Sequence, residues 1–391
     1  MGAIGIPLAT CADRTIARLA AATESDALAK LDGATLLGER AQLAGMTIPG
    51  RTSAGGGCRL FDAVDGTLAL NLSRASDREM LPALFEAEGL DSADVEAVAR
   101  LIARSEVVAL VRRGRSMGLA IAAEGSGTRC PPYPYEELVP GLPAPTHPRR
   151  APRVVDLSAL WAGPLAAHLL WLAGAEVVKV ESRTRPDSMR DGNNTFYTLL
   201  NQGKASVALD FRNDSERQAL LSLISASDIV IEASRPRALA QLGIDAAQIV
   251  RTTPGLVWVT ITAHGAAGEA ANWVGFGDDC GVSGGLSAAL RASTGHSGFV
   301  GDAIADPLTG MWAALAAWEA WASGRGGRLG VTMSEVVAHC LASERAQNPL
   351  GIESSLMAWE AAVGRPFPTV DRRRIGPLPA FGEQTRSYLG L

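Results

Sequence analysis

The feature that most constrains this chain is a strand–helix–strand pattern beginning near residue 154. Residues 154–157 form a short apolar strand, residues 165–173 have helical character, and residues 176–181 form a second valine-rich strand. Such a unit implies a parallel strand pair joined by a right-handed crossover. The alternation continues through residues 206–211, 215–225, 228–232, 238–242, 256–262, 307–323 and 328–333. The chain therefore predicts an α/β fold with a doubly wound, mostly parallel Rossmann-like sheet.

A proline-rich stretch precedes this pattern and predicts a domain boundary. Residues 131–153 hold eight of the chain's 21 prolines, and proline neither continues a helix nor sits in the middle of a sheet. We therefore expect a linker at 131–152 and a large domain at 153–391. Residues 1–130 are less regular and predict a smaller α+β domain, with helices at 15–22, 24–31, 77–88 and 91–104 and strands at 67–72 and 118–123.

Composition narrows the choice of partners. The net charge is −5, aromatic residues are only 5%, and no basic run is interleaved with them, so we expect neither nucleic acid nor membrane as a partner. The five cysteines are scattered without a CxxC pair, so no metal site is expected. The first residues lack the basic flank of a signal peptide, and no run of about 18 apolar residues appears. These features predict a soluble, cytoplasmic protein.

The turn after the first strand of the large domain is a candidate anion site. It leads into a helix N-terminus, where unpaired N–H groups and the helix dipole favour negative charge. Glu181 ends the second strand, where a dinucleotide fold keeps its ribose-binding acid. The turn, however, contains only Gly163 and lacks the GxGxxG pattern, which disfavours a nicotinamide-dependent dehydrogenase. A phosphate-bearing ligand and a purely structural turn both stay open on these grounds.

Five segments in fixed order resemble the family III CoA-transferases. The first is VVDLSALWAGPLAAHLLWLAGAEVVKVE, followed by NQGKASVALDF, SDIVIEASRPRALAQLGI, GLVWVTITAHG and VGDAIADPLTGMWAAL. The closing IGPLPAFGEQT is also similar to the end of the family. Residues 59–90 resemble the family's small domain, which normally follows the start of the large one, so the domain order looks permuted. The resemblance implies an enzyme that transfers CoA from an acyl-CoA donor to a carboxylic acid acceptor, most simply as a homodimer.

By this resemblance Asp306 is the catalytic residue. It falls on the aspartate through which the transferases form an aspartyl-CoA thioester, and a carboxylate nucleophile suits that chemistry. The residue stands before Pro307, so it also fits the N-cap of the following helix, which is the alternative reading. Asp302, four residues earlier, is expected at the surface or behind Asp306. No permanently bound cofactor is implied, because CoA and acyl-CoA are the substrates.

The resemblance also implies binding residues. Those expected to contact CoA are Lys204, Arg183, Arg185, Arg235, Trp161 and Ala162, although each cation also fits a solvated surface charge. Those expected at the substrate or in a lid are Gly55, Gly56, Gly57, His264 and Phe276, with a flexible turn and a structural histidine as alternatives. Racemases of the family carry a histidine where this chain has Phe276 and Gly277, and neither residue can move a proton. An acyl-CoA racemase or epimerase and a non-catalytic acyl-CoA-binding relative are the alternative functions.

Overall fold

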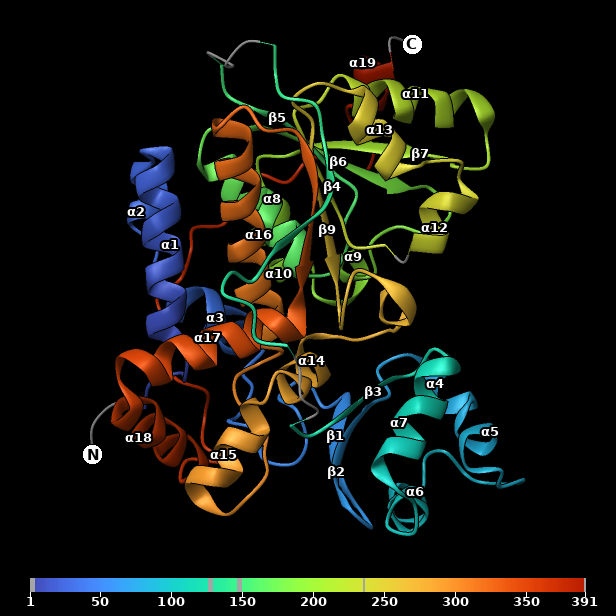
Figure 1. Ribbon diagram of the computed structural model, residues 1–391, viewed down its shortest axis with the longest axis vertical. Helices are drawn as coiled ribbons and strands as arrows, with labels where there is room; N and C mark the ends of the chain where they lie inside the picture. The colour runs from blue at the N-terminus through green and yellow to red at the C-terminus, as the bar shows by residue number, and fades with distance from the viewer. Residues whose placement is uncertain (1–3, 126–128, 146–149, 235, 390–391) are drawn as a thin grey trace.

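A seven-stranded sheet forms the centre of the computed structural model, which describes residues 4–125, 129–145, 150–234 and 236–389 (Figure 1). Six neighbouring strands are parallel, and the edge strand β4 pairs antiparallel with β10. In sheet order the strands are β4 (Glu136–Pro140), β10 (Gly327–Thr332), β9 (Val257–Thr262), β8 (Ile229–Glu232), β5 (Arg153–Asp156), β6 (Glu176–Ser182) and β7 (Ala205–Leu209). The α/β fold class with a mostly parallel sheet is thus confirmed.

Helices cover both faces of this sheet, as a doubly wound fold requires. Alternate side chains of one strand point to opposite faces: Val154 packs with the first core, and its neighbour Val155 packs with the second. The first core lies under α8 (Ala162–Leu172), α10 (Asn194–Asn201) and α16 (Ala305–Ala322). The second lies under α11 (Asp214–Ser225), α12 (Pro236–Gln241) and α13 (Ala246–Thr252), while α19 (Thr385–Leu389) packs beside β7.

A separate antiparallel sheet of three strands lies below the large one in Figure 1. Its strands are β1 (Cys58–Ala63), β2 (Gly66–Asn71) and β3 (Ala120–Ala123). One face packs on α5 (Leu81–Phe85), α6 (Val95–Ile102) and α7 (Val107–Ser116), and the short helix α4 (Ala75–Glu79) contacts α5. The other face meets Val282 of α14 (Gly277–Ser283) and Phe299. Helix α14 thus lies between the small sheet and the start of α16.

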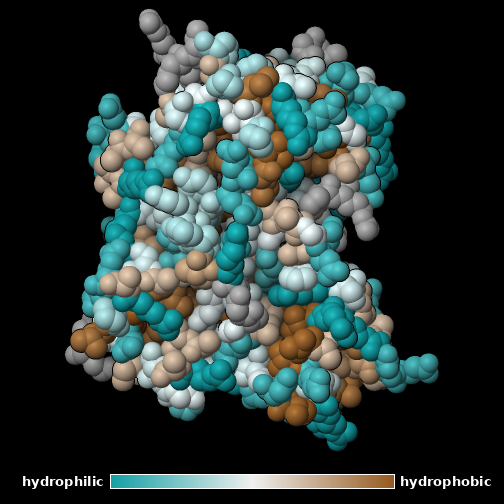
Figure 2. Space-filling model, viewed as in Figure 1, coloured by the Kyte–Doolittle hydropathy of each residue, from teal (hydrophilic) through white to brown (hydrophobic). Residues whose placement is uncertain are grey.

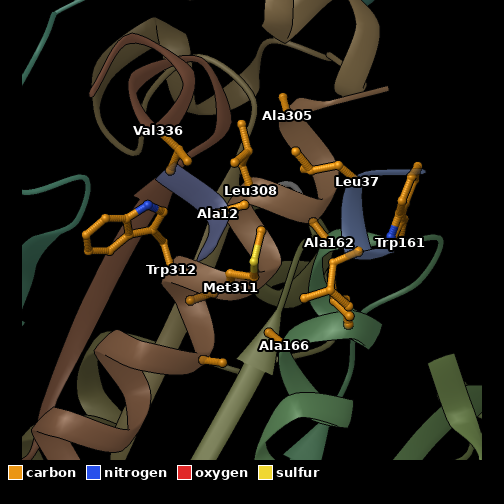
Figure 3. Close-up of a cluster of buried hydrophobic side chains, with 14 of the residues drawn as sticks. Ala12, Leu37, Trp161, Ala162, Ala166, Ala305, Leu308, Met311, Trp312 and Val336 are labelled. Carbon is orange, nitrogen blue, oxygen red and sulfur yellow. The ribbon is translucent and has the colours of Figure 1, made fainter. Parts of the chain in front are cut away.

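The N-terminal helices pack on the large sheet's side of the molecule. These are α1 (Ala9–Thr23), α2 (Asp26–Ala29) and α3 (Gly33–Leu43), and their apolar residues belong to the same core as α8 and α16. In Figure 3, Leu37 of α3 lies near Trp161 at the start of α8 and Ala305 at the start of α16. The segment predicted as a linker contains β4. The division of the chain into domains at residue 130 stays a prediction.

The remaining elements connect these layers. They are α9 (Met189–Gly192), the 3-10 helix η1 (Gly268–Asn272), α15 (Leu286–Thr294), α17 (Met333–Gln347) and α18 (Pro349–Glu360). Hydrophilic residues predominate on the face shown in Figure 2, and apolar side chains gather in separate patches, one of them over the small sheet and its helices. Among the described helices, none has the length and apolar character needed to span a membrane.

Candidate active site

The Asp306 carboxyl group lies where two helices begin. It stands in the first turn of α16 and accepts a hydrogen bond from the backbone amide of Ala162, the first residue of α8. The positive ends of two helix dipoles therefore point at the same partly buried carboxyl group. Its own amide donates to the carbonyl of Ala303 at 2.8 Å, so it lies inside the helix start rather than acting as a simple side-chain cap.

Strained backbone precedes each of these helices. Leu160, before α8, has φ 68°, and Ala303, before α16, has φ 41°, a region that residues other than glycine rarely adopt. An aspartate holds each residue in place. The amide of Leu160 donates to Asp187 Oδ2 at 3.1 Å, and that of Ala303 donates to Asp278 Oδ1 at 3.1 Å. Strain of this kind persists only where the surroundings enforce it, and it concentrates at functional sites.

Asp306 and two further aspartates, Asp302 and Asp278, lie around a single arginine, Arg40. Arg40 of α3 forms a two-point ion pair with Asp302, with Nε 2.7 Å from Oδ2. Asp302 is fully buried, so the expectation of a surface position is wrong, and it lies directly behind the site. The Arg40 guanidinium also stands 4.8 Å from the centre of the Trp161 ring. Asp278, in the first turn of α14, completes the group.

The electrostatics of this group favour protonated carboxyl groups. Burial raises the pKa of Asp306 to about 7, with Asp278 and Asp302 adding to the rise and Arg40 opposing it. Burial and the charge of Asp302 raise the pKa of Asp278 to about 6. Two carboxyl groups that titrate near neutral pH in one place are typical of sites that perform chemistry.

The glycine run lies beside this group. A Cβ atom on Gly55 would come 3.7 Å from Nη2 of Arg40, and Gly56 has φ +76°, which suits a tight turn. Ser53, just before the run, hydrogen-bonds to Asp278. The structure thus brings the glycine run next to the arginine and acids that surround Asp306, and its role as a substrate or lid segment stays a prediction.

Space around Asp306 is limited on the α14 side. A Cβ atom on Gly277 would stand 2.2 Å from Oδ2 of Asp306 and 2.2 Å from the carbonyl oxygen of Ala303, so only glycine fits this position. Phe276 precedes it at the N-cap of α14, with the Arg74 guanidinium 5.6 Å from its ring centre. The backbone of α14 is therefore packed directly against the candidate nucleophile.

His264 follows β9 and forms a second polar group with Asp279 and Cys280. Nε2 of His264 lies 3.4 Å from Oδ2 of Asp279, and neither ring nitrogen makes a well-aligned hydrogen bond. The three side chains have ligand atoms within 4.8 Å of one another. Burial raises the pKa of the Cys280 thiol well above its usual range, and its Sγ contacts the carbonyl of Ala263 at 3.5 Å. These three groups alone do not assign a metal to this place.

Lys204 has a structural place instead of the expected phosphate contact. Its ammonium group is buried and donates at 2.9 Å to Oδ2 of Asp156, to the carbonyl of Pro164 and to Oδ1 of Asn201. Three acceptors use all three ammonium protons, so none is left for a phosphate. The lysine ties strand β5 to the start of α8, and thereby supports the loop that carries Trp161 and Ala162.

Two of the other predicted CoA-binding cations, Arg183 and Arg185, are exposed and follow the carboxyl end of β6. Arg183 pairs with Glu216, and Arg185 is exposed just beyond β6. Arg235 lies outside the described residues. Trp161 is buried with no partner for its Nε1, while the backbone amide of Ala162 donates to the Asp306 carboxyl group.

Comparison with known families decides the assignment. Residues 152–361, slightly more than half of the chain, match the family model described as CoA-transferase family III. The chain belongs to CoA-transferase family III. Helix α3 and the glycine run lie outside the matched segment, whereas Asp306, Asp302 and Asp278 lie inside it.

Individual relatives match the chain over part of their length. A succinyl-CoA–D-citramalate CoA-transferase of Chloroflexus aurantiacus is 30% identical over 44% of this chain and 45% of its own. A succinate–glutarate CoA-transferase of Agrobacterium fabrum is 28% identical over 49% and 52%. A solved structure, Rv3272 of Mycobacterium tuberculosis, is 27% identical over 52% of this chain and 61% of its own, with a TM-score of 0.46. The chain thus spans about half the length of the curated relatives it matches.

Sequence reasoning missed Arg40 and Asp278. Arg40 is 262 residues away from its partner Asp302, and no local pattern announces a contact at that separation. Asp278 carries a weak signal, because two adjacent acids begin an otherwise apolar helix.

Proposed function

We propose that this enzyme transfers CoA from an acyl-CoA donor to a carboxylic acid through a thioester on Asp306. The observation that carries the proposal is the position of the Asp306 carboxyl group, which is partly buried at the meeting point of two helix N-termini and has a pKa raised to about 7. Membership of CoA-transferase family III and the transferase names of the relatives support the same reaction class.

The reaction is two exchanges on one carboxyl group. A carboxylate oxygen of Asp306 attacks the thioester carbonyl of the donor. The C–S bond breaks, CoA departs as a thiolate, and a mixed anhydride between Asp306 and the acyl group forms on the enzyme. The thiolate then attacks the Asp306 carbonyl and releases the donor as a free carboxylate, leaving aspartyl-CoA. The acceptor carboxylate repeats these steps in the opposite sense, which restores Asp306 and yields the new acyl-CoA.

The surroundings suit these steps. A carboxylate with a pKa near the working pH is ionised often enough to attack and is more basic than an exposed aspartate. When the CoA thiolate or the acceptor attacks the Asp306 carbonyl, negative charge forms on an Asp306 oxygen. The amide of Ala162 and the dipoles of α8 and α16 stabilise that charge, because they are fixed in a partly dry site. We propose that the glycine run closes over the bound acyl group, since it lies beside Arg40 and its residues accept tight turns.

The position of Gly277 disfavours the racemase alternative. A two-base racemase needs a second proton-transferring side chain facing the aspartate. Any Cβ atom at residue 277 would collide with Oδ2 of Asp306, and neighbouring Phe276 has no titratable group. Exchange of deuterium into the α-carbon of a 2-methylacyl-CoA would revive that alternative.

The test is intact-protein mass spectrometry after mixing with succinyl-CoA, acetyl-CoA and other acyl-CoAs. We expect a hydroxylamine-labile adduct with the mass of CoA, absent from Asp306→Asn. An adduct that persists in Asp306→Asn would refute the assignment of the nucleophile. Binding of CoA esters without any adduct would favour a non-catalytic acyl-CoA-binding protein.

Two further properties stay proposals of the same kind. We propose a homodimer, as the family resemblance implies, and a cytoplasmic location. Sedimentation analysis of the purified chain tests the first, and a sedimentation coefficient that corresponds to a monomer at micromolar concentration would contradict it.

A further inference from the structure

We propose that Arg40, on helix α3 of the N-terminal segment, is the positioning residue that keeps Asp306 available as a carboxylate. The inference rests on the proposed function of Asp306 and adds a residue from outside the family-matched segment to the site. It assigns to α3 a role in catalysis that its position in the sequence does not reveal.

The geometry of Arg40 holds its charge in one place. Its two-point pair with the fully buried Asp302 fixes the guanidinium plane, and the Trp161 ring covers the group at 4.8 Å. A planar guanidinium held by a carboxylate and an aromatic ring loses little further freedom on binding another acceptor. The arginine side chain is 20% exposed, whereas its partner Asp302 is fully buried.

The charges that face Asp306 come from three directions. Arg40 of α3 supplies the positive charge, Asp278 of α14 and Asp302 of the preceding loop supply negative charge, and Cys280 of α14 is a neutral thiol. The amide of Ala162 on α8 is the remaining polar contact. Arg40 is thus the one cation among the charged groups identified around Asp306 in the described residues, and without it three acids would face one another.

A second pair on the same helix offers a matched control. Glu39, the residue before Arg40, forms a two-point ion pair with Arg373, and both side chains are buried. This pair has the same chemistry but is not among the groups that shift the pKa of Asp306 most. Replacement of Arg373 disturbs an ion pair of α3 without touching the site, whereas replacement of Arg40 does both. Comparison of the two variants therefore distinguishes a general effect on α3 from an effect on Asp306.

The experiment is a carboxyl ¹³C NMR titration of aspartate-labelled protein, with the Asp306 signal assigned by its absence from Asp306→Asn. We expect Arg40→Gln to move the titration of Asp306 upward by about one to two pH units. Arg40→Lys retains the charge and should restore most of the shift, although it loses the fork geometry. Arg373→Met should leave the titration of Asp306 where it is in the unmodified protein.

An Asp306 titration that is identical in Arg40→Gln and the unmodified protein would overturn the inference. If Arg40→Gln does not fold, the double variant Arg40→Met/Asp302→Leu removes both charges of the pair and leaves neither buried alone. An upward shift is still expected, because Arg40 influences Asp306 more than Asp302 does, and a downward shift would contradict us. The titration uses no substrate, so failure of the aspartyl-CoA proposal would be seen separately, in the adduct assay.

Discussion

Two aspartates of the large domain, the buried Asp156 and the partly buried Asp306, show opposite electrostatic arrangements in one fold. Asp156 ends the strand before α8, and Lys204 and Lys179 lie 2.9 and 3.9 Å from its carboxylate. Burial alone would raise its pKa, but these cations outweigh the penalty and lower it to about 2. Asp306 shares one arginine with two other acids, and burial raises its pKa to about 7.

The difference in pKa between the two aspartates reflects a structural role for Asp156 and a chemical role for Asp306. A carboxylate with its own cations is a stable anchor, and Asp156 with Lys204 holds the loop that presents Ala162 to the site. A carboxyl group that must share its cation stays reactive but costs stability at neutral pH. Changes at the two aspartates should therefore have opposite signs for folding and different consequences for activity.

The largest expected effect is on turnover when the reactive carboxylate is removed. Asp306→Asn keeps the size of the side chain but removes the nucleophile, so kcat should fall by about a thousandfold or more. Steady-state transfer with a donor from the adduct screen measures this. Asp156→Asn is the control, since it should reduce activity mainly through loss of folded protein. An equal loss of kcat per folded molecule in both variants would contradict the assignment of different roles to the two aspartates.

The next effect is on stability when the anchor loses its cation. Lys204→Met leaves Asp156 buried with only the more distant Lys179, and the free energy of unfolding should fall by about 3 to 5 kcal/mol. Urea denaturation measures the change. A companion variant, Lys204→Met/Asp156→Leu, removes both charges and should recover part of the loss. If the single variant were as stable as the unmodified protein, the anchoring role of Lys204 would be wrong.

A smaller effect has the opposite sign at the reactive site. The folded-state pKa of Asp306 lies above its unfolded value, so its contribution to stability is present below about pH 4 and is lost as the pH rises through about 7. Asp306→Asn removes that penalty and should stabilise the protein at pH 8 by up to about 4 kcal/mol, with no gain at pH 4. Thermal unfolding at both pH values tests this.

The anchor should show the reverse pH dependence. The pKa of Asp156 is lowered to about 2, so its stabilising contribution is present above about pH 4 and is lost as the pH falls through 2. Asp156→Asn should therefore destabilise the protein at pH 8. A destabilising effect of both substitutions at pH 8 would contradict the contrast drawn between the two aspartates.

The smallest expected effect concerns the exposed arginines beyond β6. If Arg183 or Arg185 contacts the nucleotide phosphates, replacement of either by Met should raise the KM for the CoA ester by about two- to fivefold, as for an exposed ion pair. Initial rates at low salt measure this. An unchanged KM for both variants would leave them as surface charges, with Arg183 serving only its pair with Glu216.

Much of the large sheet could be predicted from the sequence. Six strands follow from short β-branched runs and match the structure within about two residues, since a parallel sheet buried on both faces needs such runs. Strand β4 escaped notice because it lies in the proline-rich segment, and its proline is tolerated at a sheet edge. Helix α3 was missed because it follows Asp32 and Gly33, a pair of residues typical of a turn. In the structure, Asp32 is the N-cap of α3 and its side chain accepts a hydrogen bond from the amide of Thr35.

The candidate site was only partly predictable. Asp306, Trp161, Ala162 and the glycine run follow from the resemblance to the transferases, and the structure places them around one another. Lys204 was placed by the resemblance alone, which cannot show that three internal acceptors surround the ammonium group. Arg40 depends on a contact between segments far apart in the chain, and burial and charge at such contacts are properties of the folded molecule.

The most direct measurement is a map of the carboxyl group that carries CoA. The protein is mixed with succinyl-CoA, trapped with hydroxylamine and digested, and the hydroxamate is located by tandem mass spectrometry. The account predicts a hydroxamate on Asp306 and none on Asp278, Asp302 or Asp156. A hydroxamate on any of these other carboxyl groups, with Asp306 unmodified, would contradict it.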